Sequence, residues 1–297
     1  MVYIKTYELS LYVIIIGMKT NGKTKIIGVF GNPISHTASP AMHNAAFEHL
    51  NLDYIYIPIL VNPSEIGTAV NAIRAYNMAG VNVTIPFKET VIPYLDELDS
   101  FAENVGAVNT IVNNNGILKG YNTDGPGFIL SLQEESNFSL NNKTVFIFGA
   151  GGAAKGLAHI LIQNKIGKLV IFDLDNTKAE SLANSVQKMA TINVSNIQKP
   201  EAIKAALEES DLVINSTPVG MAPNIDRSPI QDFSWASNSK LCYDIIYKPA
   251  KTKFLQESEK HGAQIMGGAG MLAGQGILAF NLFTGKNVPY EIMRKEV

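Results

Sequence analysis

Residues 144–154 read TVFIFGAGGAA, and this stretch decides the fold of the second half of the chain. The apolar run at 144–148 has the length of a buried strand, and the glycines that follow it open a helix predicted over 153–164. A strand, a G-x-G-x-x-A turn and a helix together are typical of a dinucleotide pyrophosphate site, because glycine lets the backbone approach phosphate and the helix N-terminus is positive. The alternative interpretation is a glycine-rich turn that binds no ligand.

The acidic residue after the next strand bears on which dinucleotide would bind. The strand predicted over 168–172 ends at Asp173, at the distance from the turn where a carboxylate accepts hydrogen bonds from an adenosine ribose. A 2′-phosphate there would meet the carboxylates of Asp173 and Asp175, with Lys178 as the one cation close in sequence. NAD is therefore favoured over NADP, although the same residues also fit a solvated loop that caps the following helix.

Alternating strand and helix patterns extend from this stretch in both directions. Upstream, strands are predicted over 26–30, 54–60 and 80–85, helices over 39–50 and 63–76, and a hairpin with arms at 107–112 and 117–121. Downstream, helices are predicted over 178–189, 274–283 and 289–294, and strands over 212–215 and 241–246. Such alternation is typical of a mostly parallel sheet covered by helices, and a polar break at 122–125 divides it into two α/β domains. The pattern does not settle which domain the last two helices join.

The composition of the 297 residues excludes several functions. A formal charge of −2, without clustered lysine and arginine, gives no attraction for nucleic acid. Cys242 is the one cysteine, so neither an intrachain disulfide nor a cysteine-based zinc site can form, which favours a cytoplasmic location. The five histidines have no spacing typical of a metal site, and we expect no metal. The apolar run at 9–16 is too short to cross a membrane, and residues 1–22 are interpreted as an N-terminal extension that need not be structured.

A second set of polar residues lies in the first domain. Residues 82–88 read NVTIPFK and put Thr84 and Lys88 at the carboxyl end of a predicted strand, where open α/β sheets bind ligands. Asn109 follows a similar run, and Asp124 lies at the interdomain break. Lys88 and Asp124 would suit an acid/base pair that moves a proton on or off a hydroxyl while a hydride leaves the same carbon. Taken singly, these residues are more simply a surface lysine, a capping aspartate and a turn asparagine.

Separated blocks between about residues 27 and 290 resemble the shikimate dehydrogenase family, in that family's order. They are GNPI at 31–34 with HTASP at 36–40, NVTIPFK at 82–88, GAVNT at 106–110, NTDG at 122–125, GAGGA at 149–153 and GMLAGQ at 270–275. The resemblance implies a two-domain α/β fold. An amino-terminal substrate-binding domain over 23–122, completed by C-terminal helices over 272–297, would join a Rossmann-type domain with a doubly wound parallel sheet over 123–271.

The resemblance also implies which residues act. Lys88 and Asp124 would be the catalytic pair, and Thr37 with Ser39 would bind a substrate carboxylate near the start of a helix. Thr84, Asn109, Gln275 and Tyr247 would contact the substrate hydroxyls or ring, and the cofactor would contact Gly149, Ala150, Gly151, Gly152, Ala153, Asp173, Thr217, Ile245 and Gly268. A lysine ammonium already carries the proton that a forming alkoxide needs. We therefore expect Lys88 to donate the proton when a carbonyl is reduced.

The implied activity is the reversible reduction of 3-dehydroshikimate to shikimate, a step toward chorismate, by a monomer or homodimer with no nucleic acid or membrane partner. Two departures from the family bear on this expectation. Thr37 stands where the family usually has serine, and Asp-Leu-Asp at 173–175 stands where NADP-binding members have Asn-Arg-Thr. NADP(H), the family default, stays open beside NAD(H), and an NAD-dependent quinate/shikimate dehydrogenase is the alternative. A catalytically silent nucleotide-sensing protein is a third interpretation, and the presence of both Lys88 and Asp124 argues against it.

Overall fold

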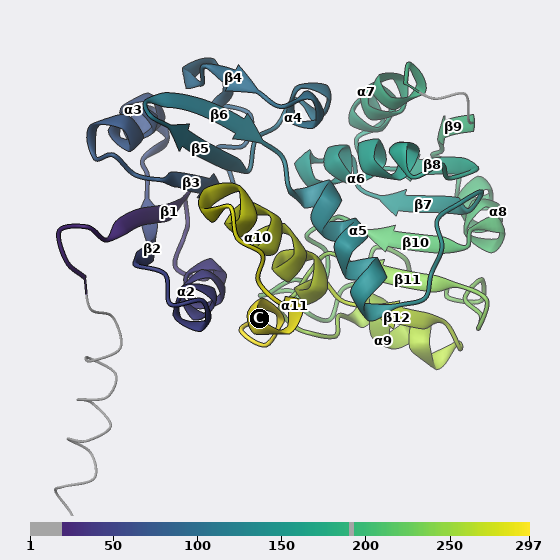
Figure 1. Ribbon diagram of the computed structural model, residues 1–297. Coiled ribbons are helices and arrows are strands. Elements are labelled where there is room, and N and C mark those ends of the chain that lie inside the picture. The colour runs from purple at the N-terminus through teal and green to yellow at the C-terminus, as the bar shows by residue number, and fades with distance from the viewer. Residues whose placement is uncertain (1–19, 190–192) are drawn as a thin grey trace, which may run out of the picture.

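The computed structural model describes residues 20–189 and 193–297, which form two α/β domains side by side (Figure 1). The predicted extension over residues 1–22 lies outside the described residues except at 20–22. No helix of the described part of the chain is both long and apolar enough to span a bilayer.

The first domain is built on a mixed sheet with the strand order β2-β1-β3-β5-β6-β4. Its strands are β1 (Lys25–Gly31), β2 (Tyr54–Leu60), β3 (Gly80–Val83), β4 (Glu97–Leu98), β5 (Thr110–Asn114) and β6 (Ile117–Tyr121). Its helices are α2 (Ser39–His49), η1 (Pro63–Glu65), α3 (Ile66–Ala75), η2 (Ile92–Tyr94) and α4 (Ser100–Val105). Strand β1 is parallel to β2 and β3, whereas β5 is antiparallel to β3 and β6 because the hairpin reverses the chain. Strand β4 is parallel to β6, so β5 alone runs against the other strands, and the prediction of a mostly parallel sheet with a hairpin is confirmed.

The second domain has the doubly wound sheet that the sequence predicted, in the order β12-β11-β10-β7-β8-β9. Its strands are β7 (Thr144–Phe148), β8 (Lys168–Phe172), β9 (Asn193–Asn196), β10 (Leu212–Asn215), β11 (Leu241–Asp244) and β12 (Gln264–Met266). Its helices are α5 (Asp124–Glu135), α6 (Gly152–Gln163), α7 (Asn176–Gln187), α8 (Pro200–Glu209) and α9 (Lys253–Lys260). The strand pairs described for this sheet are parallel. The crossover order is that of a Rossmann sheet, with the pyrophosphate turn after its central strand β7.

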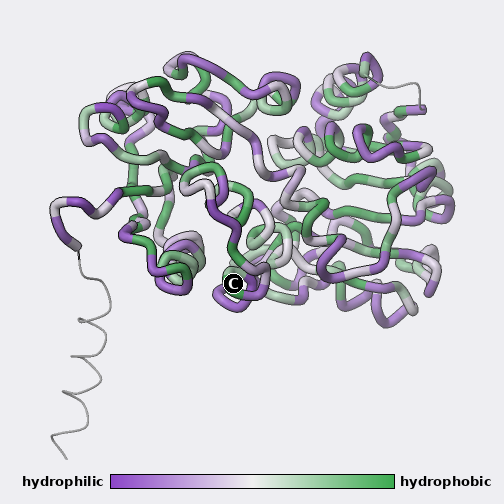
Figure 2. Tube along the Cα trace, in the orientation of Figure 1, coloured by the Kyte–Doolittle hydropathy of each residue, from purple (hydrophilic) through white to green (hydrophobic). Residues whose placement is uncertain are grey.

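Helices cover both faces of this sheet, which explains why its strands are continuous apolar runs. Along β7, Val145 and Ile147 pack with Leu157 of α6, whereas Phe146 and Phe148 point to the opposite face. There they join the core residues of α8 and α9. Figure 2 shows the resulting pattern, with hydrophobic strands inside and hydrophilic segments on the outer helices and loops.

The chain ends with α10 (Ala269–Thr284) and α11 (Tyr290–Arg294), which lie between the domains (Figure 1). Helix α10 packs along α5, and its residues share a core cluster with α2 and β1 of the first domain. The last helical segment thus contacts the first domain. Because α10 also contacts the first helix of the second domain, it forms the joint between the two halves.

Several predicted boundaries differ from the structure. Strand β3 ends at 83 instead of 85, β5 begins at 110 instead of 107, and β11 ends at 244 instead of 246. Helix α10 begins at 269 instead of 274, and α7 covers 176–187 instead of 178–189 because Asp175 caps it. The largest omission is α5, since the supposed polar break at 122–125 is the start of a helix.

Candidate active site

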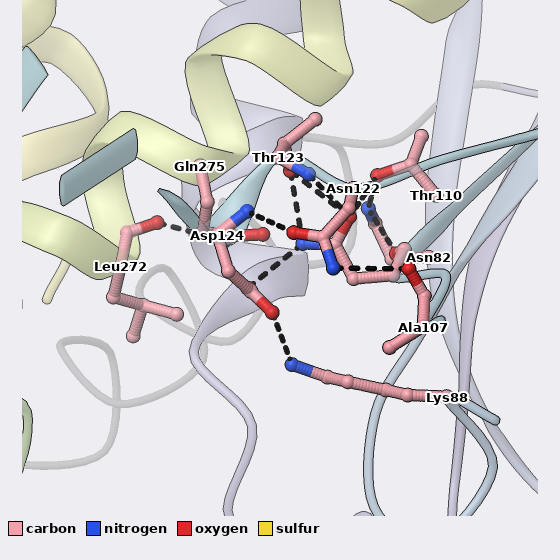
Figure 3. Close-up of polar contacts among 10 residues, drawn as sticks. Asn82, Lys88, Ala107, Thr110, Asn122, Thr123, Asp124, Leu272 and Gln275 are labelled. Carbon is pink, nitrogen blue, oxygen red and sulfur yellow. Dashed lines mark hydrogen bonds and ion pairs between the residues drawn. The ribbon is translucent and has the colours of Figure 1, made fainter. Parts of the chain in front are cut away.

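Lys88 and Asp124 form an ion pair where the two domains meet (Figure 3). The lysine Nζ donates to Asp124 Oδ2 at 2.6 Å. The Lys88 backbone lies in the loop after β3, where its carbonyl oxygen accepts a hydrogen bond from the N–H of Val108 at 2.8 Å. Asp124 is the first residue of α5, and its N–H donates to Asn122 Oδ1 at 3.0 Å. The side chains are 24% and 10% exposed, so the pair is sheltered but still reachable.

Asn109 holds the second oxygen of Asp124. Its Nδ2 donates to Asp124 Oδ1 at 2.8 Å and to Thr123 Oγ1 at 2.9 Å. Its Oδ1 accepts the N–H of Thr123 at 2.8 Å, which fixes the orientation of the amide. Asp124 therefore has one oxygen bound by an amide and the other turned toward Lys88. The structure brings three of the predicted site residues into direct contact.

The predicted carboxylate pair lies at the start of α2. The N–H of Ser39 donates to Thr37 Oγ1 at 3.2 Å, which leaves the hydrogen of the Thr37 hydroxyl available to a ligand. Ser39 is the first residue of the helix, its N–H is bound by Thr37, and Pro40 follows it without an N–H. The free Thr37 hydroxyl hydrogen and the positive end of the helix dipole fit a carboxylate.

The other predicted substrate residues come from three separate elements. Thr84 follows β3, and its N–H donates to the carbonyl oxygen of Phe30 at 2.9 Å. Gln275 lies on α10, where its Nε2 donates to the carbonyl oxygen of Leu272 at 2.8 Å. Tyr247 follows β11, and its hydroxyl donates to the carbonyl oxygen of His36 in the other domain at 3.4 Å. Burial raises the pKa of Tyr247, so this hydroxyl stays a hydrogen-bond donor.

The glycine-rich turn has the shape that a pyrophosphate site requires. Gly149 has a φ of +102°, and its N–H donates to the carbonyl oxygen of Phe172 at 2.7 Å. A Cβ at Gly151 or Gly152 would meet no atom of the described residues within 4 Å, so a ligand can approach the backbone of these two residues. No described side chain caps α6, which leaves its first N–H groups open to an anion. These residues, with Ala150 and Ala153, fit a dinucleotide.

Asp173 lies beside this turn. Its Oδ2 accepts the N–H of Ala150 at 2.7 Å, and its Oδ1 accepts the N–H of Asp175 at 2.8 Å. Asp175 is the N-cap of α7, since its side chain accepts the N–H groups of Thr177 and Lys178. The helix cap that was the alternative interpretation of this loop is therefore present at Asp175, while Asp173 contacts the turn.

Thr217, Ile245 and Gly268 follow the carboxyl ends of β10, β11 and β12, respectively. The N–H and hydroxyl of Thr217 donate to Asn215 Oδ1 at 3.1 and 2.7 Å. A Cβ on Gly268 would overlap the carbonyl oxygen of Ile245, so glycine is what lets these two loops touch. All three lie at the sheet edge where doubly wound folds bind their ligands.

A cavity of about 540 Å³ opens beside Ala150, between α6 and α7. Two of its lining residues are lysines, and both have acidic partners. Lys155 Nζ lies 2.8 Å from Glu89 Oε1 of the other domain, and Lys178 Nζ lies 3.6 Å from Asp175 Oδ2. Two lysines whose charges are already paired therefore line the cavity beside the glycine-rich turn.

Sequence reasoning did not assign a role to Asn82, Thr110 or Thr123, which support the ion pair. Asn82 Nδ2 donates to Thr110 Oγ1 at 3.0 Å, and Thr110 Oγ1 donates to Asn109 Oδ1 at 3.0 Å (Figure 3). The available signal was an asparagine in the middle of an otherwise apolar strand. A buried amide needs partners, and these lie next to the Lys88–Asp124 pair.

A Rossmann-type domain joined to an α/β domain that presents a lysine–aspartate pair defines a two-domain, nicotinamide-dependent oxidoreductase. Three family models match the chain: the shikimate dehydrogenase substrate binding domain at residues 29–111, shikimate / quinate 5-dehydrogenase at 131–246 and the shikimate 5′-dehydrogenase C-terminal domain at 268–297. The chain belongs to the shikimate/quinate dehydrogenase family.

Curated relatives and solved structures resemble the chain over nearly all of its length. Shikimate dehydrogenase (NADP(+)) of Desulforamulus reducens is 44% identical over 277 residues, which cover 93% of this chain and 95% of the relative. The enzyme of the same name from Carboxydothermus hydrogenoformans is 41% identical, over 94% and 99%. Shikimate 5-dehydrogenase from Listeria monocytogenes, in complex with shikimate and NAD, has a TM-score of 0.89 at 33% identity, over 94% and 98%. Quinate dehydrogenase from Corynebacterium glutamicum, in complex with NAD, has 0.84 at 29%, over 92% and 98%.

Proposed function

We propose that this protein reversibly reduces 3-dehydroshikimate to shikimate with a nicotinamide cofactor. The observation that carries the proposal is the Lys88–Asp124 pair, held at 2.6 Å between the substrate domain and the Rossmann domain. In this pair one Asp124 oxygen binds the Lys88 ammonium and the other binds the Asn109 amide. A dinucleotide sensor that performs no chemistry does not need a lysine held in this way. The assignment of the substrate rests on family membership together with the match of both domains to relatives that act on shikimate.

Lys88 is the proton donor in the proposed mechanism. A bound nicotinamide supplies the hydride to the carbonyl carbon. The Lys88 ammonium donates its proton to the carbonyl oxygen, so that C=O becomes CH–OH, and the amine takes the proton back in the reverse direction. Asp124 Oδ2 keeps the ammonium in place, and Asn109 keeps Asp124 from turning away.

Thr37 and Ser39 orient the substrate by its carboxylate. Their hydroxyls donate hydrogen bonds to the two carboxylate oxygens near the positive end of α2, so no arginine is needed. Thr84, Gln275 and Tyr247 contact the ring hydroxyls from the other sides. Fixing the ring at both ends holds its reacting carbon in place for hydride transfer.

We propose NAD(H) as the preferred cofactor. Asp173 and Asp175 place two carboxylates at the loop where a 2′-phosphate would lie, and Leu174 is 92% exposed where a guanidinium would be useful. Lys155 and Lys178 are close, but their charge is already compensated by Glu89 and Asp175. The curated relatives are named for NADP(+), so this choice is the point at which the chain would depart from them.

Quinate is the second candidate substrate, and the acidic loop at 173–175, which resembles that of NAD-using relatives that also accept quinate, supports it. The additional methyl of Thr37 changes the shape of the carboxylate site, and the quinate dehydrogenase of similar fold has NAD bound. A cytoplasmic location and a monomeric or homodimeric state stay predictions. The burial of Cys242, which raises its thiol pKa to about 11 and keeps it unreactive, is compatible with a reducing compartment.

The test is an absorbance assay of nicotinamide reduction by the purified protein, with shikimate or quinate and with NAD or NADP. We expect the highest kcat/KM for shikimate with NAD. A kcat/KM much higher with NADP than with NAD would refute the interpretation of Asp173, but it would not affect the proposed reaction. Cofactor binding without turnover of either substrate would overturn the proposed activity and favour the silent sensor.

A further inference from the structure

Tyr56 is a buried residue of β2 whose hydroxyl binds a side chain of the neighbouring site strand β3. It is 1% exposed, and its hydroxyl donates to Asn82 Oδ1 at 2.7 Å. Ser39 at the start of α2 lowers the pKa of this hydroxyl, although burial raises it more. The hydroxyl therefore ties β2 to β3, the strand that leads to Lys88.

From Asn82 the hydrogen bonds continue to the ion pair in one direction (Figure 3). Asn82 Nδ2 donates to Thr110 Oγ1 at 3.0 Å, and that hydroxyl donates to Asn109 Oδ1 at 3.0 Å. Asn109 Nδ2 then donates to Asp124 Oδ1 at 2.8 Å. Asn82 Nδ2 also donates to the main-chain carbonyl oxygen of Asn109 at 3.1 Å, and Asn109 Oδ1 also accepts the Thr123 N–H. The orientation of each amide is therefore set jointly by the preceding group in the series and by the main chain. Tyr56 is the first donor of this series.

The ring of Tyr56 is held by His43 of α2. The two rings are nearly parallel, at 6° with centroids 4.2 Å apart. Neither ring nitrogen of His43 has a hydrogen-bond partner among the described residues, so the imidazole packs here as a flat, uncharged surface. Burial lowers the pKa of His43 to about 3, which keeps the ring neutral near pH 7.

We propose that Tyr56 is a positioning residue for proton transfer: its hydroxyl fixes the Asn82 amide and, through Thr110 and Asn109, the orientation of Asp124. Tyr56 carries none of the chemistry itself. The two orientations of the Asn82 amide have the same shape, so hydrogen bonds must select between them. Without the phenolic donor, a buried amide oxygen is left unsatisfied and the selection weakens.

The substitution Tyr56→Phe removes this hydroxyl alone, and Tyr243→Phe is the matched control. Tyr243 is also fully buried, and its hydroxyl hydrogen-bonds Ser131 at 2.8 Å within the Rossmann domain. In the shikimate assay, which rests on the proposed function, Tyr56→Phe should lower kcat about tenfold, the scale of one buried hydrogen bond. It should also shift the pH profile of kcat and leave the cofactor KM within about twofold of wild type. Tyr243→Phe should leave kcat and its pH profile unchanged.

Hydrogen exchange of the Thr123 amide gives a readout that needs no substrate. This N–H donates to Asn109 Oδ1, so its exchange rate reports how firmly the Asn109 side chain is held. We expect faster exchange in Tyr56→Phe than in Tyr243→Phe or wild type. Thr110→Val breaks the next link of the series, and it should reproduce the same change even if Tyr56→Phe fails to fold.

Equal Thr123 exchange in Tyr56→Phe and Tyr243→Phe, together with equal kcat, would overturn the proposal. Thr110→Val without faster exchange would overturn it as well. A wild-type protein that does not oxidise shikimate would refute the proposed function instead. The exchange measurement would still decide whether Tyr56 orients the pair.

Discussion

A Cβ on Gly274 would overlap the main-chain carbonyl oxygen of Gly127, because α10 and α5 cross there with their backbones in contact. The crossing lies one turn from Asp124 on α5 and next to Gln275 on α10. Gln275, from the end of the chain, is therefore brought beside the Lys88–Asp124 pair by two glycines. The closeness of the two helices is a condition for the geometry of the site.

Gly274→Ala should lower the free energy of unfolding by about 2 kcal/mol or more, because the new methyl group has no room against the α5 backbone. Gly276→Ala is the control on the same helix. Its Cβ would meet the ends of two flexible methionine side chains, Met42 and Met293, at 3.2 and 3.4 Å. Gly276→Ala should cost less than about 1 kcal/mol, since alanine also favours the helix. Chemical denaturation of both variants measures the difference, and equal losses would show that the crossing does not need Gly274.

In the Rossmann half the sequence predicted β7, β8, β10 and β11 with α6 and α7, and it missed α5, α8, α9, β9 and β12. Strands β7, β8 and β10 are covered on both faces, so each is a continuous apolar run. The first polar or glycine residue after the run shows where each strand ends. Helix α5 was missed because it begins Asp-Gly-Pro-Gly, residues that usually break helices, and its stability comes from packing against α10. Strand β9 was missed because Asn193–Asn196 is a polar edge.

The residues of the site likewise fall into those that the sequence predicted and those that it missed. Lys88, Asp124 and the glycine turn follow strand ends and could be placed from local sequence together with the family resemblance. The support of Asp124 by Asn82 and Tyr56 could not, because it depends on which strands are neighbours. Tyrosine in an alternating strand is read as core, and only the tertiary structure shows where its hydroxyl points.

Leu174→Arg should raise kcat/KM for NADPH by about tenfold and change that for NADH little. Leu174 is almost fully exposed beside Asp173, so an arginine there costs no packing and offers a guanidinium to a 2′-phosphate. Leu174→Gln is the uncharged control. Steady-state kinetics with both cofactors measures the effect. An equal change in kcat/KM for NADPH and NADH in Leu174→Arg would show that the 2′-phosphate of the cofactor does not lie beside residue 174.

Thr37→Ser should change the KM for shikimate or the ratio of kcat/KM between shikimate and quinate, and should leave the cofactor KM alone. The substitution keeps the hydroxyl that accepts the Ser39 N–H and removes one methyl group. Comparison of both substrates at saturating cofactor gives the answer. Unchanged substrate constants would remove Thr37 from the carboxylate site.

His43→Phe should become more stable relative to wild type as the pH falls below about 6.5. The folded protein holds His43 neutral down to a pKa of about 3, whereas the unfolded chain takes up a proton near 6.5. The wild type therefore loses up to about 1.4 kcal/mol per pH unit from this residue on acidification, and the phenylalanine variant does not. Near pH 7 the substitution should be close to neutral, because no described partner of the imidazole is lost. Denaturation series between pH 7 and 5 measure this, and parallel curves would contradict the burial of a neutral histidine.

The central claim is that Lys88 donates the proton during reduction of the carbonyl, and kcat of Lys88→Ala with 3-dehydroshikimate tests it most directly. We expect kcat to fall by about 10² to 10⁴, with KM changed only a few-fold and cofactor binding retained. Lys155→Ala, which removes an exposed lysine paired with Glu89, serves as the control for loss of a positive charge near the domain boundary. A folded Lys88→Ala protein with kcat near that of wild type would contradict the account.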